Sequence, residues 1–279
     1  MFDAMFASRA QPRLIVTADD FGLHQAVNQA VEQAYRSGVL RAASLMVAAP
    51  AAADAVERAR RMPGLAVGLH VVLADGKAML PAQQIPRLVD DHGWFDSTMV
   101  RNGFRFFFVP EVRRQLAAEI RAQFEAFAAT GLPLDHVNAH KHFHVHPTVL
   151  SLLLSIGRDF GLRAVRLPNE PGMGVWLRPW LKLMRARIDR AGMVYNDHVF
   201  GLRHSGGMDE DTLLDVLRHL PDGLSELYLH PALHDGITAS MADYRHADEL
   251  AALLSPRVRI AISEYCRSCN GFSDPAASA

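Results

Sequence analysis

The stretch Ile15-Val16-Thr17-Ala18-Asp19-Asp20-Phe21-Gly22 decides the fold. An apolar, β-branched run ends in two carboxylates and a glycine, and a helix-period pattern follows, which predicts a strand, an acidic tip and a helix. Strand tips are where α/β sheets and barrels carry their chemistry. Adjacent strand residues point to opposite sides, so one carboxylate can bind a metal while the other handles a proton. The structural alternative is a helix cap, since Asp before a helix accepts hydrogen bonds from free backbone N–H groups.

Composition places the chain among ordinary globular proteins. It has 279 residues, 49% hydrophobic and 21% charged, with a formal net charge of -1, which fits one α/β barrel and gives no support for nucleic-acid binding. No apolar stretch approaches the roughly 20 residues of a membrane span, and residues 1–11 lack the apolar core of a signal peptide, so we expect a cytoplasmic protein. Cys266 and Cys269 are too few for a disulfide scaffold or a zinc knuckle, and we expect them at the surface.

Short apolar runs alternate with longer helix-period segments, a rhythm that favours parallel strands with right-handed crossovers. We therefore predict one domain over residues 1–279, a (β/α)-barrel-like fold of the TIM type, regular or distorted, with flexible tails at 1–12 and 268–279. The expected strands are 14–18, 44–48, 66–70, 134–139, 164–167, 226–230 and 257–263, and the expected helices are 25–37, 51–61, 111–130, 147–160 and 242–254.

Two segments interrupt this rhythm. Residues 71–110 form a long insertion after the third strand, rich in Pro, Gly and Asp, and insertions of this length are usually lids or binding loops. Residues 169–191 combine Trp176 and Trp180 with several arginines and a lysine, a mixture typical of a helix lying on a membrane surface.

The densest chemical signal is the tract from His136 to His146, which holds five of the fourteen histidines. In an extended chain, alternate residues of the tract would share one face: His136, Asn138, His140, His142 and His144. Neutral imidazole is the commonest side-chain metal ligand, so this strand end predicts at least one ligand. The alternative is a solvated or structural histidine tract.

Two further expected strands end in His70 and in His230, so these side chains can converge with the acidic pair at one face. One carboxylate and two histidines would leave coordination positions open, which is typical of a catalytic metal site. Such a site favours hydrolysis of an amide or ester, with one Asp as the base and His230 as the acid. Arg166, at another strand tip, is expected to pair with an Asp and keep it ionised, unless it is a surface arginine.

In chain order, the motifs at 17–22, 67–70, 136–144 and 229–231 resemble those of the YdjC-like carbohydrate deacetylases, which include chitooligosaccharide deacetylases. The resemblance implies a barrel-like fold and hydrolysis of an N-acetyl group on an amino sugar. It further implies a divalent metal held by Asp20, His70 and His140, with Asp19 as the base and His230 as the acid.

The histidine-rich motif departs from the family pattern at one position. Asn138 stands where relatives commonly carry Asp, which removes a carboxylate behind the ligands and leaves His144 as the alternative to His140. His142, His144, Asn138 and Arg166 are expected to support the site or contact substrate. Zinc or magnesium suits these ligands best, and nickel or cobalt would also fit.

Residues 46–50, 103–110 and 176–187 resemble the hopanoid-biosynthesis-associated subgroup of this family. That resemblance implies conversion of N-acetylglucosaminyl hopanoid to glucosaminyl hopanoid plus acetate. A lipid-linked substrate needs an apolar channel or a membrane-facing surface, which would bring the protein to the inner membrane as a peripheral partner. The residues expected to contact lipid are Phe104, Phe107, Trp176 and Trp180. A core strand and buried helix, or a homodimer interface, are alternative uses of the same residues.

The sequence leaves three alternatives to hydrolysis of a lipid-linked N-acetyl sugar. Soluble chitooligosaccharides are the alternative substrate. A metal-dependent phosphoesterase would need a second acidic cluster for a two-metal site, and none is evident in the sequence. A non-catalytic sugar- or lipid-binding barrel would not need Asp19.

Overall fold

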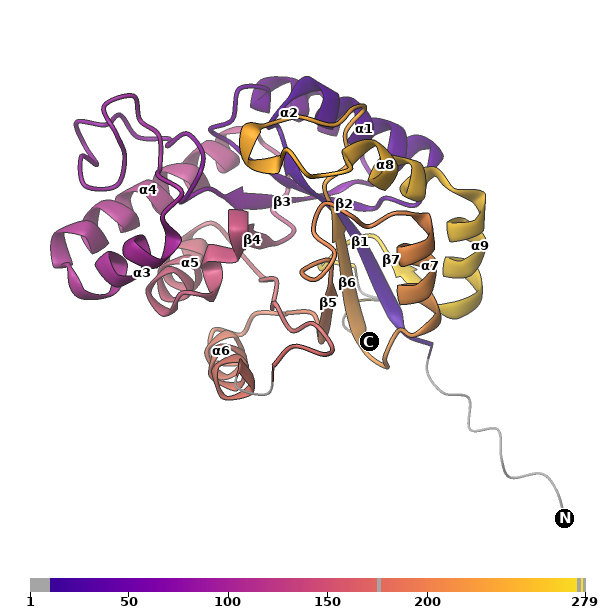
Figure 1. Ribbon diagram of the computed structural model, residues 1–279. Coiled ribbons are helices and arrows are strands. Elements are labelled where there is room, and N and C mark those ends of the chain that lie inside the picture. The colour runs from indigo at the N-terminus through magenta and orange to yellow at the C-terminus, as the bar shows by residue number, and fades with distance from the viewer. Residues whose placement is uncertain (1–10, 175–176, 275–276, 278–279) are drawn as a thin grey trace, which may run out of the picture.

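The computed structural model describes residues 11–174, 177–274 and 277, so the predicted lipid contact of Trp176 lies outside the described residues. Seven parallel strands form one sheet in the order β4-β3-β2-β1-β6-β5, and β7 pairs with the free part of the β1 edge (Figure 1). The strands are β1 (Arg13–Phe21), β2 (Ala42–Leu45), β3 (Ala66–Val71), β4 (Val137–Ala139), β5 (His198–Phe200), β6 (Leu224–Leu229) and β7 (Arg267–Cys269).

The sheet curls toward closure beyond its two outer strands. Isolated parallel bridges join Val137 to Val165 and Ala164 to Val194, so hydrogen bonding continues from β4 toward the segment that enters β5. The expected strand at 164–167 is therefore a pair of bridges rather than a regular strand. This arrangement confirms the α/β, barrel-like fold in its distorted form.

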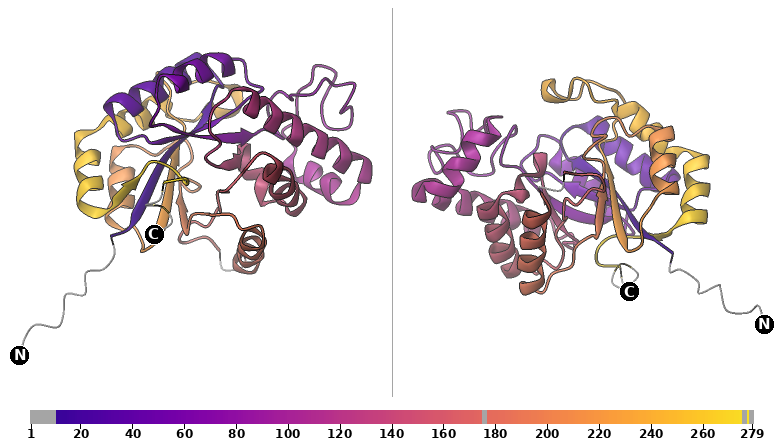
Figure 2. Two further views of the ribbon diagram at one scale, coloured as in Figure 1. Left: turned by 180° about the vertical axis from the view of Figure 1, so that it is seen from behind. Right: turned by 60° about the horizontal axis from the view of Figure 1, so that its bottom comes forward.

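Helices cover the outside of the curved sheet, as Figures 1 and 2 show from several sides. Neighbouring helices contact one another in a chain from α2 through α1 and α8 to α7 and α9, while α5 contacts both α4 and α6. The helices are α1 (Gln25–Ser37), α2 (Ala52–Arg60), α3 (Met99–Phe108), α4 (Pro110–Ala129), α5 (Pro147–Asp159), α6 (Arg178–Arg190), α7 (Glu210–Arg218), α8 (His246–Leu254) and α9 (Pro256–Tyr265). In the described residues no helix is long and apolar enough to cross a membrane.

Strand β1 lies at the centre of the sheet and is buried on both faces, as expected for a parallel strand under helices. Leu14 and Val16 pack in the main core, which includes the buried faces of the helices, whereas Ile15 packs in a smaller cluster with Leu224 and Phe272. Because side chains alternate along a strand, Ile15, Thr17 and Asp19 share one face. The central strand therefore carries one catalytic candidate, Asp19, on the face opposite the main core.

The prediction of a strand at 257–263 is wrong, because these residues form helix α9. Alternating Arg and apolar residues there indicate a strand by pattern, but Ser255 and Pro256 start a helix. The Ser255 hydroxyl accepts hydrogen bonds from the N–H groups of Arg257 and Val258, and Pro256 occupies the first turn, where its missing donor costs nothing. The last strand is β7 instead, which begins ten residues after the start of the expected strand.

The C-terminal segment differs from the expected flexible tail in the part that the structure describes. β7 pairs with β1, and Phe272 is buried. The surface position expected for Cys266 and Cys269 is also wrong, since both are buried. Burial raises the pKa of Cys266 to about 12, so this thiol is inert at neutral pH.

Candidate active site

A β-bulge in β1 brings both members of the acidic pair toward one cavity. Ala18 pairs with Ala43 and Phe21 with Leu45, so β1 contains one residue more than β2 between these pairs. Asp20 takes up the extra length with a φ of 60°, a left-handed conformation that is uncommon outside glycine. Without the bulge, Asp20 would point to the opposite side from Asp19. The bulge therefore allows two adjacent carboxylates to serve one site.

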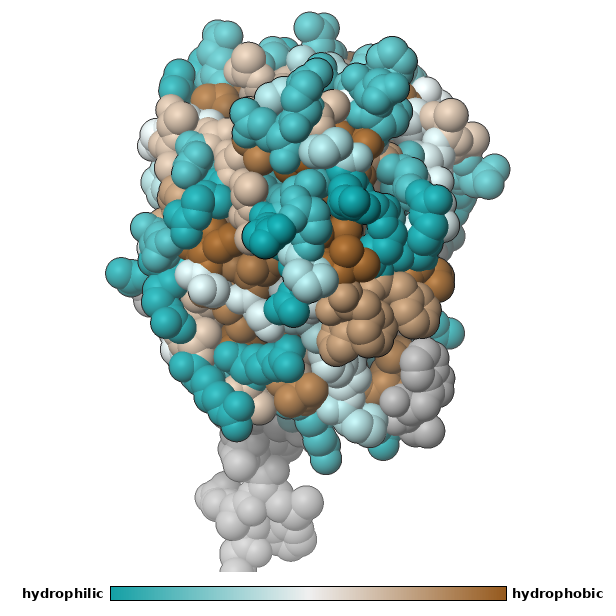
Figure 3. Space-filling model, turned by 90° about the vertical axis from the view of Figure 1, so that its left-hand side faces the viewer, coloured by the Kyte–Doolittle hydropathy of each residue, from teal (hydrophilic) through white to brown (hydrophobic). Residues whose placement is uncertain are grey.

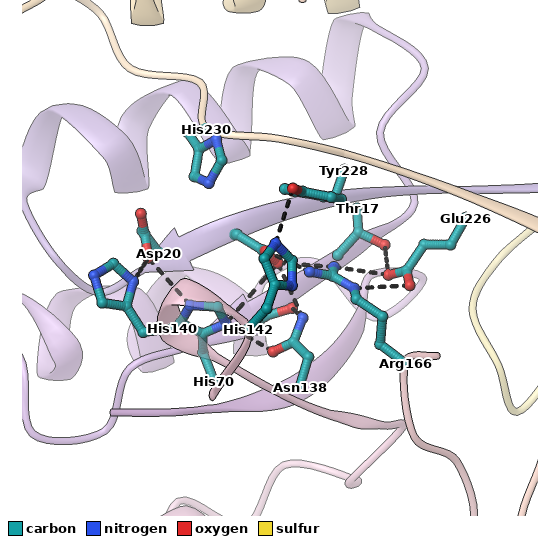
Figure 4. A network of polar contacts seen from close by, with 12 residues as sticks. Thr17, Asp20, His70, Asn138, His140, His142, Arg166, Glu226, Tyr228 and His230 are labelled. Carbon is teal, nitrogen blue, oxygen red and sulfur yellow. Dashed lines mark hydrogen bonds and ion pairs between the residues drawn. The ribbon is translucent and has the colours of Figure 1, made fainter. Parts of the chain in front are cut away.

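Asp20, His70 and His140 come together at the carboxyl ends of β1, β3 and β4 (Figure 4). Asp20 Oδ1 lies 3.3 Å from His70 Nε2 and 3.1 Å from His140 Nδ1, and one ligand atom from each residue lies within 4.8 Å of the others. His144 is not in this group. The geometry thus favours His140 over His144 as the partner of Asp20 and His70.

The three residues fit a divalent metal. Asp20 Oδ2 and His70 Nε2 are buried and have no hydrogen-bond partner, and unpaired buried polar atoms are costly unless something else satisfies them. One carboxylate and two imidazoles are a donor set that zinc and several other divalent ions accept. In the described part of the chain this is the one such group, so the second acidic cluster of a two-metal phosphoesterase is not found there.

The histidine tract does not run as an extended strand. β4 ends at Ala139, and residues 140–145 form a tight turn in which Lys141 and His142 both have positive φ. The expected shared face therefore ends early, and the later histidines occupy separate places. His140 joins the metal group, and His142 contacts Tyr228 through a 2.9 Å hydrogen bond between Nε2 and the hydroxyl. His144 is fully buried, and burial lowers its pKa to about 3.

Asn138 orients the ring of His70. Its Oδ1 can only accept, so it receives the proton of His70 Nδ1 over 2.7 Å and leaves the lone pair of Nε2 facing Asp20. Its amide nitrogen donates to Asp19 Oδ1 at 3.1 Å and to Ser44 Oγ at 2.9 Å. Asn138 thus fixes the ring of His70 within the group formed with Asp20 and His140.

The hydrogen-bonded chain continues below Asn138. Ser44 accepts from Asn138, so its own hydroxyl proton is free to donate to His136 Nε2 at 3.0 Å. His136 Nδ1 then donates to Asp135 over 2.9 Å, and Asp135 also accepts from the backbone of Phe272 and Ser273. Every bond runs in one direction, which fixes the tautomers of both histidines. The chain links the C-terminal segment to the metal group.

Asp19 is held by Arg166 on its other side. Arg166 Nη1 lies 2.5 Å from Asp19 Oδ2 and Nη2 lies 2.9 Å from Oδ1, with both residues buried. Burial by itself would raise the pKa of Asp19, but the charge of Arg166 outweighs it and holds the pKa well below its usual range. The expected pairing of Arg166 with an Asp is confirmed, and the surface alternative is wrong.

Arg166 is shared with a second buried carboxylate. Glu226 binds Nε and Nη2 of Arg166, each at 2.8 Å, and also accepts from the Thr17 hydroxyl at 2.8 Å. The guanidinium carbon lies 4.5 Å from the centre of the Tyr228 ring. The negative charge of Glu226 therefore offsets part of the positive charge that Arg166 presents to Asp19.

His230 lies across the cavity from Asp20 (Figure 4). A cavity of about 140 Å³ is lined by Asp19, His70, His140 and His230. Burial lowers the pKa of His230, while the charges of Asp20 and Asp19 act against that effect. Its Nδ1 has no hydrogen-bond partner, and its backbone N–H donates to Glu249. This cavity, called here the catalytic cavity, places a titratable imidazole opposite the acidic pair.

Sequence reasoning missed Glu226, Ser44, Tyr228, Thr17 and Asp135, the partner of His136. A signal was present for Glu226, since a charged residue inside an expected buried strand needs a partner. Ser44 and Thr17 carried no comparable signal, because a small hydroxyl residue is ordinary in a strand.

Two of the residues expected to contact lipid, Phe104 and Phe107, lie on an exposed helix rather than on a core strand. Helix α3 leaves Phe104 65% and Phe107 47% exposed, together with Val100 and Phe108, and Figure 3 shows brown apolar side chains gathered on this side of the molecule. An open groove of about 790 Å³ runs beside them, and Trp180 forms part of its lining. Lys141 and His142 line both this groove and the catalytic cavity. We call it the α3 groove.

Comparisons with known proteins agree with this geometry. A family model described as YdjC-like protein matches residues 13–264. The chain is similar to a carbohydrate deacetylase of Geobacillus stearothermophilus, 32% identical over 253 residues that make up 90% of this chain and 92% of that protein. It is 31% identical to a carbohydrate deacetylase of Brevibacillus brevis over 83% of this chain and 86% of the other.

One solved structure is also similar. A protein of Enterococcus faecalis, named for cellobiose-phosphate cleavage, has a TM-score of 0.77 and 26% identity, covering 94% of this chain and 98% of its own. All four strands that present Asp19, Asp20, His70, Asn138 and Glu226 fall within the matched residues 13–264.

Proposed function

Because the chain belongs to the YdjC-like protein family, we propose that it is a metal-dependent hydrolase that releases acetate from an N-acetyl amino sugar. The observation that carries this proposal is the catalytic cavity, where Asp20, His70 and His140 lie together beside Asp19 and opposite His230. The relatives named carbohydrate deacetylases support the same class of reaction.

The residues divide the work of amide hydrolysis. Asp20, His70 and His140 would hold the divalent ion, zinc or magnesium first, and when bound such an ion polarises a carbonyl and acidifies water. Asp19 is the base that takes the proton of the attacking water. Arg166 keeps Asp19 ionised at every working pH, while Glu226 shares the guanidinium and so leaves Asp19 some basicity.

His230 is the acid that protonates the leaving nitrogen. It follows the end of β6 and lies on the far side of the site from Asp20, which suits delivery of a proton to the opposite side of the scissile amide. Its Nδ1 has no hydrogen-bond partner, and the carboxylate of Glu249 lies 4.0 Å from it. Burial favours the neutral imidazole, and the two aspartates favour the charged form, so the charges across the cavity keep protonation within reach.

The substrate we propose is lipid-linked: N-acetylglucosaminyl hopanoid, converted to glucosaminyl hopanoid. The support is the α3 groove, which is apolar, open and contiguous with the catalytic cavity through Lys141 and His142. Phe104, Phe107 and Trp180 would receive the ring system while the sugar enters the cavity. Exposed apolar side chains on α3 would also bring the enzyme to the inner membrane as a peripheral protein.

The test measures acetate release with added Zn²⁺ or Mg²⁺ from N-acetylglucosaminyl hopanoid in vesicles and from soluble diacetylchitobiose. We expect kcat/KM on the lipid-linked sugar to exceed that on chitobiose. The double substitution Phe104→Ser and Phe107→Ser should remove this preference, and the matched exposed substitution Ile260→Ser on α9 should leave it unchanged. Turnover of chitobiose alone would assign the enzyme to soluble oligosaccharides. A monomer–dimer change in the double variant would assign the surface to a homodimer.

A further inference from the structure

A second cavity lies next to the catalytic cavity and takes no part in the mechanism above. It has a volume of about 300 Å³ and shares three lining residues with the catalytic cavity, namely His140, Ser240 and Met241. His140 also belongs to the group formed with Asp20 and His70, so this second cavity adjoins that group. We call it the side pocket.

The side pocket is lined mainly by apolar side chains. Met46 and Ala49 come from the segment after β2, Val72 follows β3, and Met241 ends the short turn Ala239–Met241. Two of its polar side chains have hydrogen-bonded partners. Asp75 binds Lys141, which is not part of the lining, over 2.7 Å. Thr238 contacts Ser240 over 3.2 Å between their hydroxyls, and the charged lining residue Lys77 is exposed. Such a lining suits a hydrocarbon group, whereas the hydroxyls of a sugar ring need free partners.

The size of the side pocket sets the length of that group. The methyl of an acetyl group is about as large as a water molecule, which takes about 30 Å³. A pocket of about 300 Å³ therefore has room for a chain several carbons longer than acetyl.

We propose that the side pocket receives the acyl chain of the substrate, and that the enzyme removes short- to medium-chain N-acyl groups from amino sugars as well as acetyl. This inference rests on the proposed amide hydrolysis. The oxygen of water bonds to the acyl carbon, the C–N bond breaks, and the nitrogen takes a proton. The products are a free amino sugar and a carboxylate of the same chain length.

The test is a chain-length series of glucosaminides bearing N-acetyl, N-butyryl and N-hexanoyl groups, with carboxylate release measured for the wild-type protein. We expect kcat/KM for the longer chains to lie within tenfold of the N-acetyl value or above it. A fall of more than tenfold at N-butyryl would overturn the inference while leaving the deacetylase intact. Release of no carboxylate from any member would overturn the proposed function as well.

A pair of neighbouring alanines supplies the matched variants. Ala49 lines the side pocket and Ala48 does not, and both are partly buried in the same segment. We expect Ala49→Leu to lower the ratio of N-hexanoyl to N-acetyl turnover at least tenfold, because added methyl groups shorten the pocket. Ala48→Leu should leave the ratio unchanged. If Ala49→Leu instead lowers turnover of diacetylchitobiose relative to the monosaccharide and spares the ratio, the pocket holds a second sugar and the inference fails.

Discussion

Arg166 and Asp19 form a buried, two-point ion pair, with Arg166 Nη1 2.5 Å from Asp19 Oδ2 and Nη2 2.9 Å from Oδ1. The same guanidinium binds Glu226, so one positive charge sits between two carboxylates. This arrangement makes the basicity of Asp19 depend on how Arg166 is shared. It therefore predicts that substitutions at Arg166 and at Glu226 shift the pKa of Asp19 in opposite directions.

Arg166→Lys should weaken the hold on Asp19. Lysine keeps the charge but cannot reproduce the two-point contact, so the pKa of Asp19 should rise toward its ordinary value. We expect kcat to fall about 10- to 100-fold, because the base loses its fixed orientation. The acid limb that Asp19 gives to the kcat/KM profile, which lies below the working pH range in wild type, should move to higher pH. Arg163→Lys, at an exposed site three residues earlier, is the control, and an unmoved acid limb in Arg166→Lys would contradict the assignment.

Glu226→Gln should act in the opposite direction. The amide keeps the size of the side chain and can still accept from Thr17, but it no longer shares the charge of Arg166. The full field then falls on Asp19 and lowers its pKa further, which makes it a poorer base. We expect kcat to fall roughly tenfold, with no Asp19 acid limb entering the working pH range. A shift to higher pH in the same measurement would show that Glu226 does not moderate Arg166.

Much of this site was predictable from strand tips alone. The convergence of Asp19–Asp20, His70, the histidine tract and His230 follows from parallel strands ending at one edge, which pattern and spacing can indicate. The choice of Asp20 and His140 as the ligands rests on the family resemblance. The bulge at Asp20 was not predictable, because it depends on the register between β1 and β2. Nor was the network behind the ligands, since Ser44 and Asn138 meet only when β2, β3 and β4 pair.

Helix α9 shows the limit of periodicity over short windows. Residues 257–263 alternate as a strand does, yet the cap at Ser255 and the first-turn proline at 256 decide for a helix. The apolar faces of Val258, Ala261 and Ile262 then lie together on one side. The helix-start signals at Ser255 and Pro256 outweighed the alternation of polar and apolar residues. The strand that pairs with the edge of β1 is β7, which follows this helix.

Asn substitutions at the acidic pair should separate metal binding from proton transfer. Asp20→Asn removes the charged ligand beside His70 and His140, so affinity for Zn²⁺ should fall at least about 100-fold. Asp19→Asn should abolish turnover while changing Zn²⁺ affinity no more than about threefold. Arg166 stays paired with Glu226 in that variant, so the fold should survive. Calorimetric titration with Zn²⁺ measures the affinity of the two variants, and acetate release measures their turnover. Equal losses of Zn²⁺ affinity in the two variants would refute the division of roles.

Asn138→Ala should reduce metal affinity without removing a ligand. The substitution frees His70 Nδ1 from its 2.7 Å acceptor, so the ring loses its fixed tautomer and orientation. Loss of such support typically costs about 10- to 100-fold in metal affinity. Ser44→Ala should cost less, because Ser44 acts through Asn138. The same Zn²⁺ titration orders the two variants, and an Asn138→Ala affinity equal to wild type would show that His70 needs no such support.

Glu249 should make stability fall as pH rises. Burial raises its pKa to about 7, although its carboxylate accepts the backbone N–H groups of His230 and Met208. Below pH 4.5 both folded and unfolded chains carry the proton. Between 4.5 and about 7 the unfolded chain releases it while the folded chain keeps it, so unfolding becomes easier with rising pH. The loss from this group should total about 3 kcal/mol and level off above pH 7.

Urea unfolding at pH 5, 6, 7 and 8 measures this contribution as the difference between wild type and Glu249→Gln. The glutamine cannot ionise, so the free energy of unfolding of wild type relative to the variant should decline by roughly 2 kcal/mol in total between pH 5 and pH 7. Glu264→Gln, which removes the same charge from an exposed position on α9, should show no such decline. A wild-type advantage that grows with pH would mean that Glu249 is ionised and stabilised in the folded protein, and the proton on this carboxyl beside His230 would then have to be reassigned.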